Sequence, residues 1–191
     1  VTEDYLSTIY SLKAEGKTVI GARLAEHLGI SAPAVTETLQ RLVREGLVQL
    51  DERKEIHLTE KGTEIAEEMV RRHRLAERWL TDVLGLDWAE AHEEAHRFEH
   101  AISGKVEERL AALLGNPQTC PHGSPIPGSG AEHFEPGQPL DQMPAGAQIV
   151  IERVSEEAEI DRRLLEYLQR CGVTPGTLLE VVENAPWAGT M

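Results

Sequence analysis

The chain has 191 residues with 33 acidic and 19 basic side chains, a formal net charge of −14. This length allows two small domains, each with its own core. We expect a cytoplasmic protein with no membrane partner, because the sequence has no apolar run of about 18 residues and its start, VTEDYLSTIY, lacks the basic-then-apolar layout of a signal peptide. Two cysteines, Cys120 and Cys171, are too few for a disulfide framework and are not spaced as a C-x-x-C pair.

The negative charge is unevenly distributed. Residues 1–74 carry 11 Lys and Arg against 13 Asp and Glu, whereas residues 75–191 carry 8 against 20. Phosphate binding needs a basic surface, and the nearly neutral first part can still present one locally. The acidic remainder is more typical of a cation-binding or solvated surface.

The first 62 residues predict a winged helix-turn-helix domain. Residues 3–14 show the apolar spacing of an amphipathic helix. Residues 21–46 follow with two helical patterns separated at Gly29, where Ser31 can cap the second helix and Pro33 lies in its first turn. The stretch LVQLDERKEIHL alternates apolar and polar residues around a charged turn, which indicates a β-hairpin.

The exposed face of the second of these helices is polar and short-chained. Such residues suit phosphate contacts and base-edge readout in the major groove, whereas a small packing module without a nucleic-acid partner would present a more apolar surface. We expect DNA contacts from Ser31, Pro33, Ala34, Thr36, Glu37, Thr38 and Arg41, with phosphate contacts from Arg23, Arg53 and Lys54.

The remaining chain divides into three parts. Helical patterns at 61–80 and about 88–114 carry apolar stripes that the winged helix cannot cover, which predicts a helical dimerisation domain over residues 63–114. Residues 115–139 hold six of the ten prolines and predict a linker rather than a packed element. Residues 140–191 place strand-like runs around a helix, with too few strands to close a small barrel, so we expect this domain to be incomplete.

Histidines and carboxylates recur at helical spacing in the predicted dimerisation domain. His92, His96, Glu99 and His100 fall on one face of a helix, and His73 and Glu77 have the i, i+4 spacing on the preceding helix. Imidazoles and carboxylates together suit divalent transition ions, and the carboxylate share favours manganese or iron(II). We therefore predict a metal site between these helices.

The quintet HEEAH at residues 92–96 also matches the H-E-x-x-H pattern of zinc metalloproteases, with Glu93 as the catalytic base. One protease class needs a third histidine ten residues after the first, where this chain has Ile102. A distant glutamate could complete the zinc site of a different protease class. No enzyme architecture, however, explains a winged helix on the N-terminal side of the motif. A protease is thus a distant alternative, and we expect neither an enzyme nor a small organic substrate.

The segments TEDYLSTIY, RRHRLAERWLTDVLGLD, AHEEAHRFEH and TCPHGSPIPG, in this order, resemble the DtxR/MntR family of diphtheria-toxin-repressor-like, metal-dependent transcriptional repressors. The resemblance spans nearly the whole chain. It implies a homodimer that binds a double-stranded palindromic operator when loaded with Mn(II) or Fe(II) and represses metal-uptake genes. It also implies a mainly α fold with small β parts: a winged helix-turn-helix, a helical dimerisation domain and a C-terminal SH3-like (FeoA-like) small β-barrel.

Two metal sites are implied by the same resemblance. Its primary site corresponds to Asp4, His96, Glu99 and His100. Its ancillary site corresponds to His73, Glu77 and His92, to which the SH3-like domain could add Glu156 and Glu159. Since Asp4 lies on the first helix of the DNA-binding domain, an ion bound there would hold the winged helix at one angle to the dimerisation domain.

The chain departs from both branches of the family in ways that affect the choice of ion. At the position of Asp4, iron-responsive members have methionine and manganese members have aspartate. At the position of His96, iron-responsive members have cysteine and manganese members have glutamate, so His96 matches neither branch. Ser7 replaces a further glutamate of the manganese type. From the hard Asp4 carboxylate we expect Mn(II), with Fe(II) as the alternative and Zn(II), Co(II) or Cd(II) able to substitute.

Overall fold

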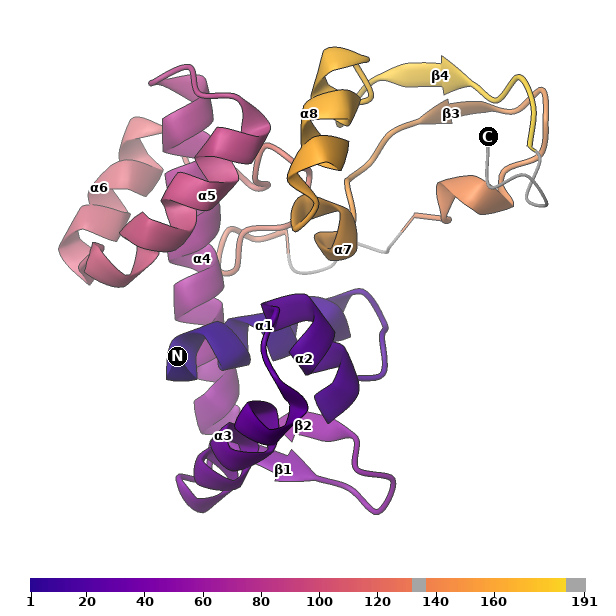
Figure 1. The fold of residues 1–191 in the computed structure, drawn as a ribbon. Coiled ribbons are helices and arrows are strands. Elements are labelled where there is room, and N and C mark those ends of the chain that lie inside the picture. Colours follow the sequence, from indigo (N-terminus) through magenta and orange to yellow (C-terminus); the bar gives the residue numbers. More distant parts are fainter. Residues whose placement is uncertain (132–136, 185–191) are drawn as a thin grey trace.

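The computed structural model describes residues 1–131 and 137–184. These residues form a mainly helical fold with two small sheets, arranged around the long helix α4 (Glu60–Asp82), as Figure 1 shows. One end of α4 packs against α1 and the other against α5 and α6. None of the described helices is long and apolar enough to cross a membrane.

The N-terminal part is the predicted winged helix-turn-helix. Three helices, α1 (Thr2–Ala14), α2 (Gly21–Leu28) and α3 (Ala32–Arg44), precede an antiparallel hairpin of β1 (Val48–Leu50) and β2 (Ile56–Leu58). The apolar positions of all five elements meet in one core, whose fully buried side chains include Leu6, Ile9, Leu12, Leu24, Leu42 and Ile56.

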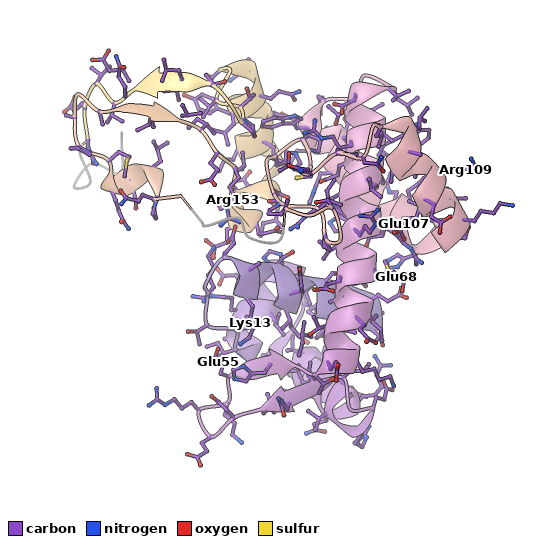
Figure 2. All side chains as sticks on the ribbon, turned by 180° about the vertical axis from the view of Figure 1, so that it is seen from behind. Lys13, Glu55, Glu68, Glu107, Arg109 and Arg153 are labelled. Carbon is purple, nitrogen blue, oxygen red and sulfur yellow. The ribbon has the colours of Figure 1, made fainter. Side chains whose placement is uncertain are left out.

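Local signals in the sequence set these element boundaries. Gly29 adopts φ 64° and ends α2, a left-handed conformation that favours glycine. The Ser31 hydroxyl then caps α3 by accepting a hydrogen bond from the backbone of Ala34. At the hairpin, Lys13 of α1 donates to Glu55 at 3.1 Å, and Figure 2 labels the two residues next to each other beside the hairpin.

The prediction of one continuous helix from about residue 88 to residue 114 is wrong. The structure instead has α5 (Trp88–Phe98), a 3-10 turn η1 (Glu99–Ala101) and α6 (Gly104–Leu113). Ile102 is extended at φ −76° and ψ 112°, and Ser103 caps the new helix by accepting from the backbone of Val106. The break turns Glu99 and His100 toward α1.

The apolar stripes of the dimerisation helices divide between two roles. Met69, Leu75 and Ile102 are buried within the chain itself. Phe98 and Leu113 remain exposed, together with Val83, Leu84 and Val106. Exposed apolar residues of this kind are typical of an interaction surface.

Part of the segment expected to be a linker is packed in the structure. Cys120, His122 and Ile126 are buried. Three arginines of α4 hold this segment through its backbone: Arg71 donates to the carbonyl of Pro127 at 2.7 Å, Arg78 donates to that of Thr119 at 2.8 Å, and Arg74 donates to that of Pro125. A proline-rich segment offers few amide donors, so its carbonyls need partners of this kind when they are buried.

The C-terminal part contains η2 (Leu140–Gln142), β3 (Gln148–Val150), α7 (Glu156–Glu159), α8 (Arg162–Arg170) and β4 (Leu178–Glu180). Strands β3 and β4 pair antiparallel with Ile149 opposite Leu179. An apolar cluster of Trp88, Ala89, Val154 and Leu165 attaches this part to the start of α5, beside which α8 lies in Figure 1.

Candidate metal centre

Helices α4 and α5 pack closely because small side chains lie between them. Ala76 of α4 and Ala91 and Ala95 of α5 are fully buried at their contact. The faces next to these alanines carry His73 and Glu77 on α4 and His92 and His96 on α5. The predicted metal-binding residues of the two helices are therefore brought together, in two clusters.

The first cluster joins α1 to η1 and consists of Asp4, Glu99 and His100. His100 Nε2 lies 3.0 Å from Asp4 Oδ1 and 3.5 Å from Glu99 Oε1. One ligand atom from each of the three residues lies within 4.8 Å of the others, close enough for a shared ion.

His96, the fourth residue of the predicted primary site, lies at the edge of the first cluster. Its Nδ1 is 3.6 Å from Glu99 Oε1, and its side chain is 57% exposed. The ring of His96 faces those of His73 and His92, with centroids 4.5 Å and 4.7 Å away.

Glu99 is almost completely buried and carries a negative charge. Burial by itself would raise the pKa of Glu99, but hydrogen bonds from His73 and His96 outweigh it and lower the pKa to about 2. His73 Nδ1 lies 2.6 Å from Glu99 Oε2. The first cluster thus offers two oxygen ligands and an imidazole, a donor set that fits Fe(II) or Mn(II).

The second cluster is buried between α4, α5, the 115–131 segment and α7. It consists of Glu77, His92, His122 and Glu159. Glu77 Oε1 lies 2.8 Å from His92 Nδ1 and 3.5 Å from His122 Nδ1, which in turn is 3.5 Å from Glu159 Oε2. The cluster therefore draws ligand atoms from the dimerisation helices and from the C-terminal part.

Several buried atoms of this second cluster lack hydrogen bonds. Among the described residues, Glu77 Oε2 and both ring nitrogens of His122 have no partner that satisfies hydrogen-bond geometry. Buried polar groups are otherwise nearly always paired, so each exception needs an explanation. A divalent ion coordinated by these atoms would satisfy them, and the donor set fits such an ion.

The charges in the second cluster compensate one another. Burial opposes ionisation of both Glu77 and His122, but the two attract each other's charged form. The pKa of Glu77 is held well below its ordinary value by His73 and His122, and the pKa of His122 is raised to about 12 by Glu77 and Glu159. An imidazolium in this position occupies the electrostatic role that a metal cation would take.

Sequence reasoning missed His122. The segment TCPHGSPIPG supported the family resemblance, yet its histidine was not considered as a ligand. The C-x-H spacing of Cys120 and His122 could have indicated a further metal-binding residue. In the structure both side chains are buried next to the second cluster. Burial raises the pKa of the Cys120 thiol, and the charge of Glu77 adds to this effect.

The two C-terminal glutamates differ in position. Glu159 lies in the second cluster, where its Oε1 is 3.5 Å from the Ser124 hydroxyl. Glu156 lies outside it: its Oε1 accepts from Arg74 Nη2 at 2.7 Å, and its backbone N–H donates to Glu15 at 2.7 Å. His73 connects the two clusters, because its Nε2 is also 3.0 Å from Glu77 Oε1.

The expected DNA-contact residues lie on α3 and at the hairpin tip. Ser31, Pro33, Ala34, Thr36 and Glu37 are exposed, Thr38 is half-buried, and Arg53 and Lys54 are exposed in the turn. Two of the expected arginines are partly engaged within the chain. Arg23 donates to the carbonyl of Thr18 at 2.7 Å, and Arg41 donates to the Thr2 hydroxyl at 3.3 Å.

Glu93, the catalytic base of the protease alternative, takes no part in either cluster. Its Oε1 accepts a hydrogen bond from Arg162 of α8 at 2.8 Å. The glutamate of the HEEAH quintet thus pairs with the C-terminal part.

Three protein families match successive parts of the chain. Residues 1–56 match the family described as "Iron dependent repressor, N-terminal DNA binding domain". Residues 59–128 match "Iron dependent repressor, metal binding and dimerisation domain", and residues 138–191 match the FeoA domain.

Individual relatives match over almost the full chain. The iron-dependent repressor IdeR of Mycobacterium bovis is 42% identical and covers 98% of this chain and 86% of its own length. The diphtheria toxin repressor of Corynebacterium glutamicum is 38% identical, covering 96% of this chain and 84% of its own. A solved structure titled "Manganese-dependent transcriptional repressor complex with manganese" is 36% identical, covers 98% of this chain and 86% of its own, and superposes with a TM-score of 0.83.

Proposed function

The chain belongs to the DtxR/IdeR family of metal-dependent transcriptional repressors, and from this premise we propose that it represses metal-uptake and metal-homeostasis genes when it binds Fe(II). In this proposal a homodimer binds a palindromic operator. The observation that carries it is the meeting of Asp4 on α1 with Glu99 and His100 on η1, because this contact links the DNA-binding domain to the dimerisation domain.

Iron(II) is our first choice of ion, where the sequence alone favoured Mn(II). The curated relatives with 38–42% identity are named an iron-dependent repressor and a diphtheria toxin repressor. Mn(II) remains a second candidate on a specific observation: the Asp4 carboxylate contributes a hard oxygen to the first cluster, and solved neighbours are titled manganese regulators.

We propose the following ligands. The primary site consists of Asp4, Glu99 and His100, with His96 at its edge. The ancillary site consists of Glu77, His92 and His73, joined by Glu159 and by His122. Glu156, which was considered as a further ligand, is better explained as the partner of Arg74.

A bound ion would supply positive charge at the primary site, and this chain's residues determine what that charge does. Glu3, Asp4 and Glu99 all approach His100, so three carboxylates share one imidazole. Like charges at this distance repel unless they are compensated. Compensation would hold α1 against η1, and through α1 it would fix the angle of α3 in each half of the dimer.

The domain boundaries are part of the same proposal. We assign residues 1–62 to DNA binding and 63–114 to dimerisation and metal binding, followed by a connecting segment at 115–139 and the FeoA-type domain at 140–191. The buried residues Cys120, His122 and Ile126 then act as an extension of the metal-binding unit. For DNA contact we propose the exposed residues of α3 and of the hairpin turn. Arg23 and Arg41 also form hydrogen bonds within the protein.

A gel-shift titration with promoter DNA from the gene's own neighbourhood tests the proposal. We expect anaerobic Fe(II) to retard the DNA, and Asp4→Ala to raise the concentration of Fe(II) needed by roughly tenfold or more, since a lost ligand weakens metal binding strongly. Glu67→Ala, which removes an exposed carboxylate of α4, is the matched control. Retardation without metal, or an unchanged Fe(II) requirement in Asp4→Ala, would contradict the proposal. Parallel titrations with Mn(II) and Zn(II) rank the ions.

A further inference from the structure

Glu3 contacts the imidazole of His100 at the ring nitrogen that does not face the first cluster. His100 Nδ1 lies 2.9 Å from Glu3 Oε2, whereas His100 Nε2 lies 3.0 Å from Asp4 Oδ1. The two ring nitrogens are therefore divided between two carboxylates of α1. Only the Nε2 side belongs to the proposed primary site.

The adjacent positions of Glu3 and Asp4 on α1 make this arrangement possible. Successive residues of an α-helix are rotated by about 100° around its axis, so the two side chains leave α1 in different directions. Side chains that diverge in this way can reach both nitrogens of one ring when the ring lies between them. His100 on η1 takes that position.

Glu3 lies outside the set of atoms that could share an ion. Asp4, Glu99 and His100 each place one ligand atom within 4.8 Å of the others, and among the described residues Glu3 belongs to no such group. An ionised carboxylate can only accept a hydrogen bond, so the partner of Glu3 is the N–H of His100 Nδ1. The lone pair of Nε2 is then free for a metal ion.

Two structural roles of Glu3 offer a different explanation of the same contact. Glu3 lies in the first turn of α1, where a carboxylate is favourable next to the helix dipole. Its side chain is 46% exposed and that of His100 is 39% exposed, and ion pairs this accessible contribute little to stability. Neither role depends on which nitrogen of His100 carries the proton, so the explanations predict different results.

We propose that Glu3 is a positioning residue of the primary site, which holds the Nδ1–H of His100 and thereby directs Nε2 at the ion. Metal-binding histidines commonly donate their second ring N–H to a carboxylate, which fixes the tautomer and the ring direction and makes the imidazole a stronger ligand. This role rests on the proposed function, because it assigns a partner to one of its ligands. Two adjacent residues of the DNA-binding domain then act on one ring, Asp4 as a ligand and Glu3 as the residue that orients it.

Metal binding in the absence of DNA tests the role of Glu3. Glu159→Gln in the full chain is the background, because it weakens the second cluster and leaves α1 and η1 unchanged. The affinity for Mn(II) is measured by electron paramagnetic resonance of the free ion. We expect Glu3→Ala to weaken Mn(II) binding by about tenfold, since the loss of such a partner typically costs 10- to 100-fold. Glu67→Gln, at an exposed carboxylate of α4, is the control and should stay within about twofold of the background.

A second measurement follows the proton itself. Zn(II) is the diamagnetic probe, and nitrogen-15 labelling of histidine gives the Nδ1–H signal of His100 by nuclear magnetic resonance. His100→Gln identifies this signal by its loss. We expect the proton to exchange slowly with water in the background chain and rapidly in Glu3→Ala. In Glu3→Gln it should exchange at an intermediate rate, because the amide oxygen still accepts a hydrogen bond. A role limited to the helix dipole predicts no change in this exchange.

The two measurements together decide the proposal. It is overturned if Glu3→Ala binds Mn(II) within about twofold of the background, or if the His100 Nδ1–H exchanges equally slowly in both. A large loss of affinity with an unchanged Nδ1–H signal would make Glu3 a direct ligand and would also overturn it. Circular dichroism confirms folding of each variant. None of these readouts involves DNA, so operator retardation by Fe(II) tests the proposed function separately.

Discussion

His27 lies at the end of α2, beside the C-terminal part of the chain. It shares a small cavity with Glu156 and Glu159. Burial lowers the pKa of His27 below its ordinary value of 6.5, and the attraction of Glu156 and Glu157 only partly offsets this. The folded chain thus resists protonation of this ring more than the unfolded chain does.

This difference predicts an acid-sensitive contribution to stability. Because the folded-state pKa of His27 is the lower one, the contribution of His27 to the free energy of unfolding is constant above about pH 6.5 and falls as the pH drops below that value toward the folded-state pKa. His27→Gln should therefore reduce the loss of stability between about pH 7.5 and about pH 5.5. Urea unfolding of the metal-free protein at both values checks it, with His57→Gln as the control. An identical loss in His27→Gln and the parent chain would contradict the assignment.

Periodicity alone grouped the cluster residues only where they lie close together in the sequence, and the more distant ones followed from the family resemblance. His92, His96 and Glu99 share a helical face, and their spacing suffices to group them. His122 is 45 residues beyond Glu77 in the sequence, on a segment whose composition predicts a linker. It lies in the second cluster because arginines of α4 bind the backbone of that segment. Tertiary contacts of this kind leave no periodic signal in the sequence.

At the scale of elements, the start of α4 depends on Gly62. The Thr59 side chain caps α4 by accepting from the Gly62 backbone at 3.1 Å, and it donates to the carbonyl of Gly46 at 2.8 Å. A Cβ atom at position 62 would lie 2.0 Å from the backbone oxygen of Leu47. The backbone at Leu47 and the start of α4 therefore approach each other so closely that only glycine fits at position 62 without a shift of the backbone.

Gly62→Ala should destabilise the fold by roughly 3 kcal/mol, the upper range for overpacking, because backbone must move to admit the methyl group. Chemical denaturation of the metal-free protein measures the change. Gly104→Ala is the matched control, since a Cβ there meets nothing within 4 Å, and its effect should stay below about 1 kcal/mol. Equal effects of the two substitutions would contradict the packing argument.

Element types followed from the sequence more reliably than element ends. The winged helix rests on short-range signals, namely 3.6-residue periodicity, a cap at Ser31 and a charged hairpin turn. The division of residues 88–114 at Ile102 was not predicted, because the apolar spacing of Phe98, Ile102 and Val106 continues across it. Ser103 is a preferred N-cap residue and a Ser-Gly pair is common at turns, so a local signal for the break was present. That break is what directs His100 toward Asp4.

Three parts of the chain meet at α7. Arg74 of α4 pairs with Glu156 at 2.7 Å, and the Glu156 backbone donates to Glu15 after α1. Lys17 bridges Glu15 and Glu157, both at 2.9 Å. These contacts tie the C-terminal part to both the DNA-binding and the dimerisation domains.

Removing this junction should loosen α7 from the rest of the chain. We expect Lys17→Ala to speed amide hydrogen exchange across α7, because Glu15 then loses the cation that holds it beside the Glu156 amide. Hydrogen exchange with mass spectrometry measures the change, and Lys105→Ala, an exposed lysine of α6, provides the control. Unchanged exchange in α7 would show that the apolar cluster around Trp88 alone holds the domain.

The order of domains was predictable from sequence, but their arrangement was not. Each domain has its own periodicity and turn signals, whereas the positions of the domains depend on single ion pairs such as Arg74 with Glu156. The same holds for the proposed primary site, whose residues Asp4 and His100 come from α1 and η1, which lie far apart in the sequence.

We propose that Asp4 and η1 together fix the angle of the winged helix when an ion binds. Pulsed electron paramagnetic resonance tests this by measuring the distance between the two α3 helices of the dimer. The spin labels are attached at Thr36→Cys in a Cys171→Ser background. With added diamagnetic Zn(II) or Cd(II) in place of the native ion, the distance distribution should narrow to about 34 Å, one turn of DNA. In Asp4→Ala it should stay broad. A distance distribution that does not change when the ion is added, or that narrows equally in Asp4→Ala, would contradict this role of Asp4.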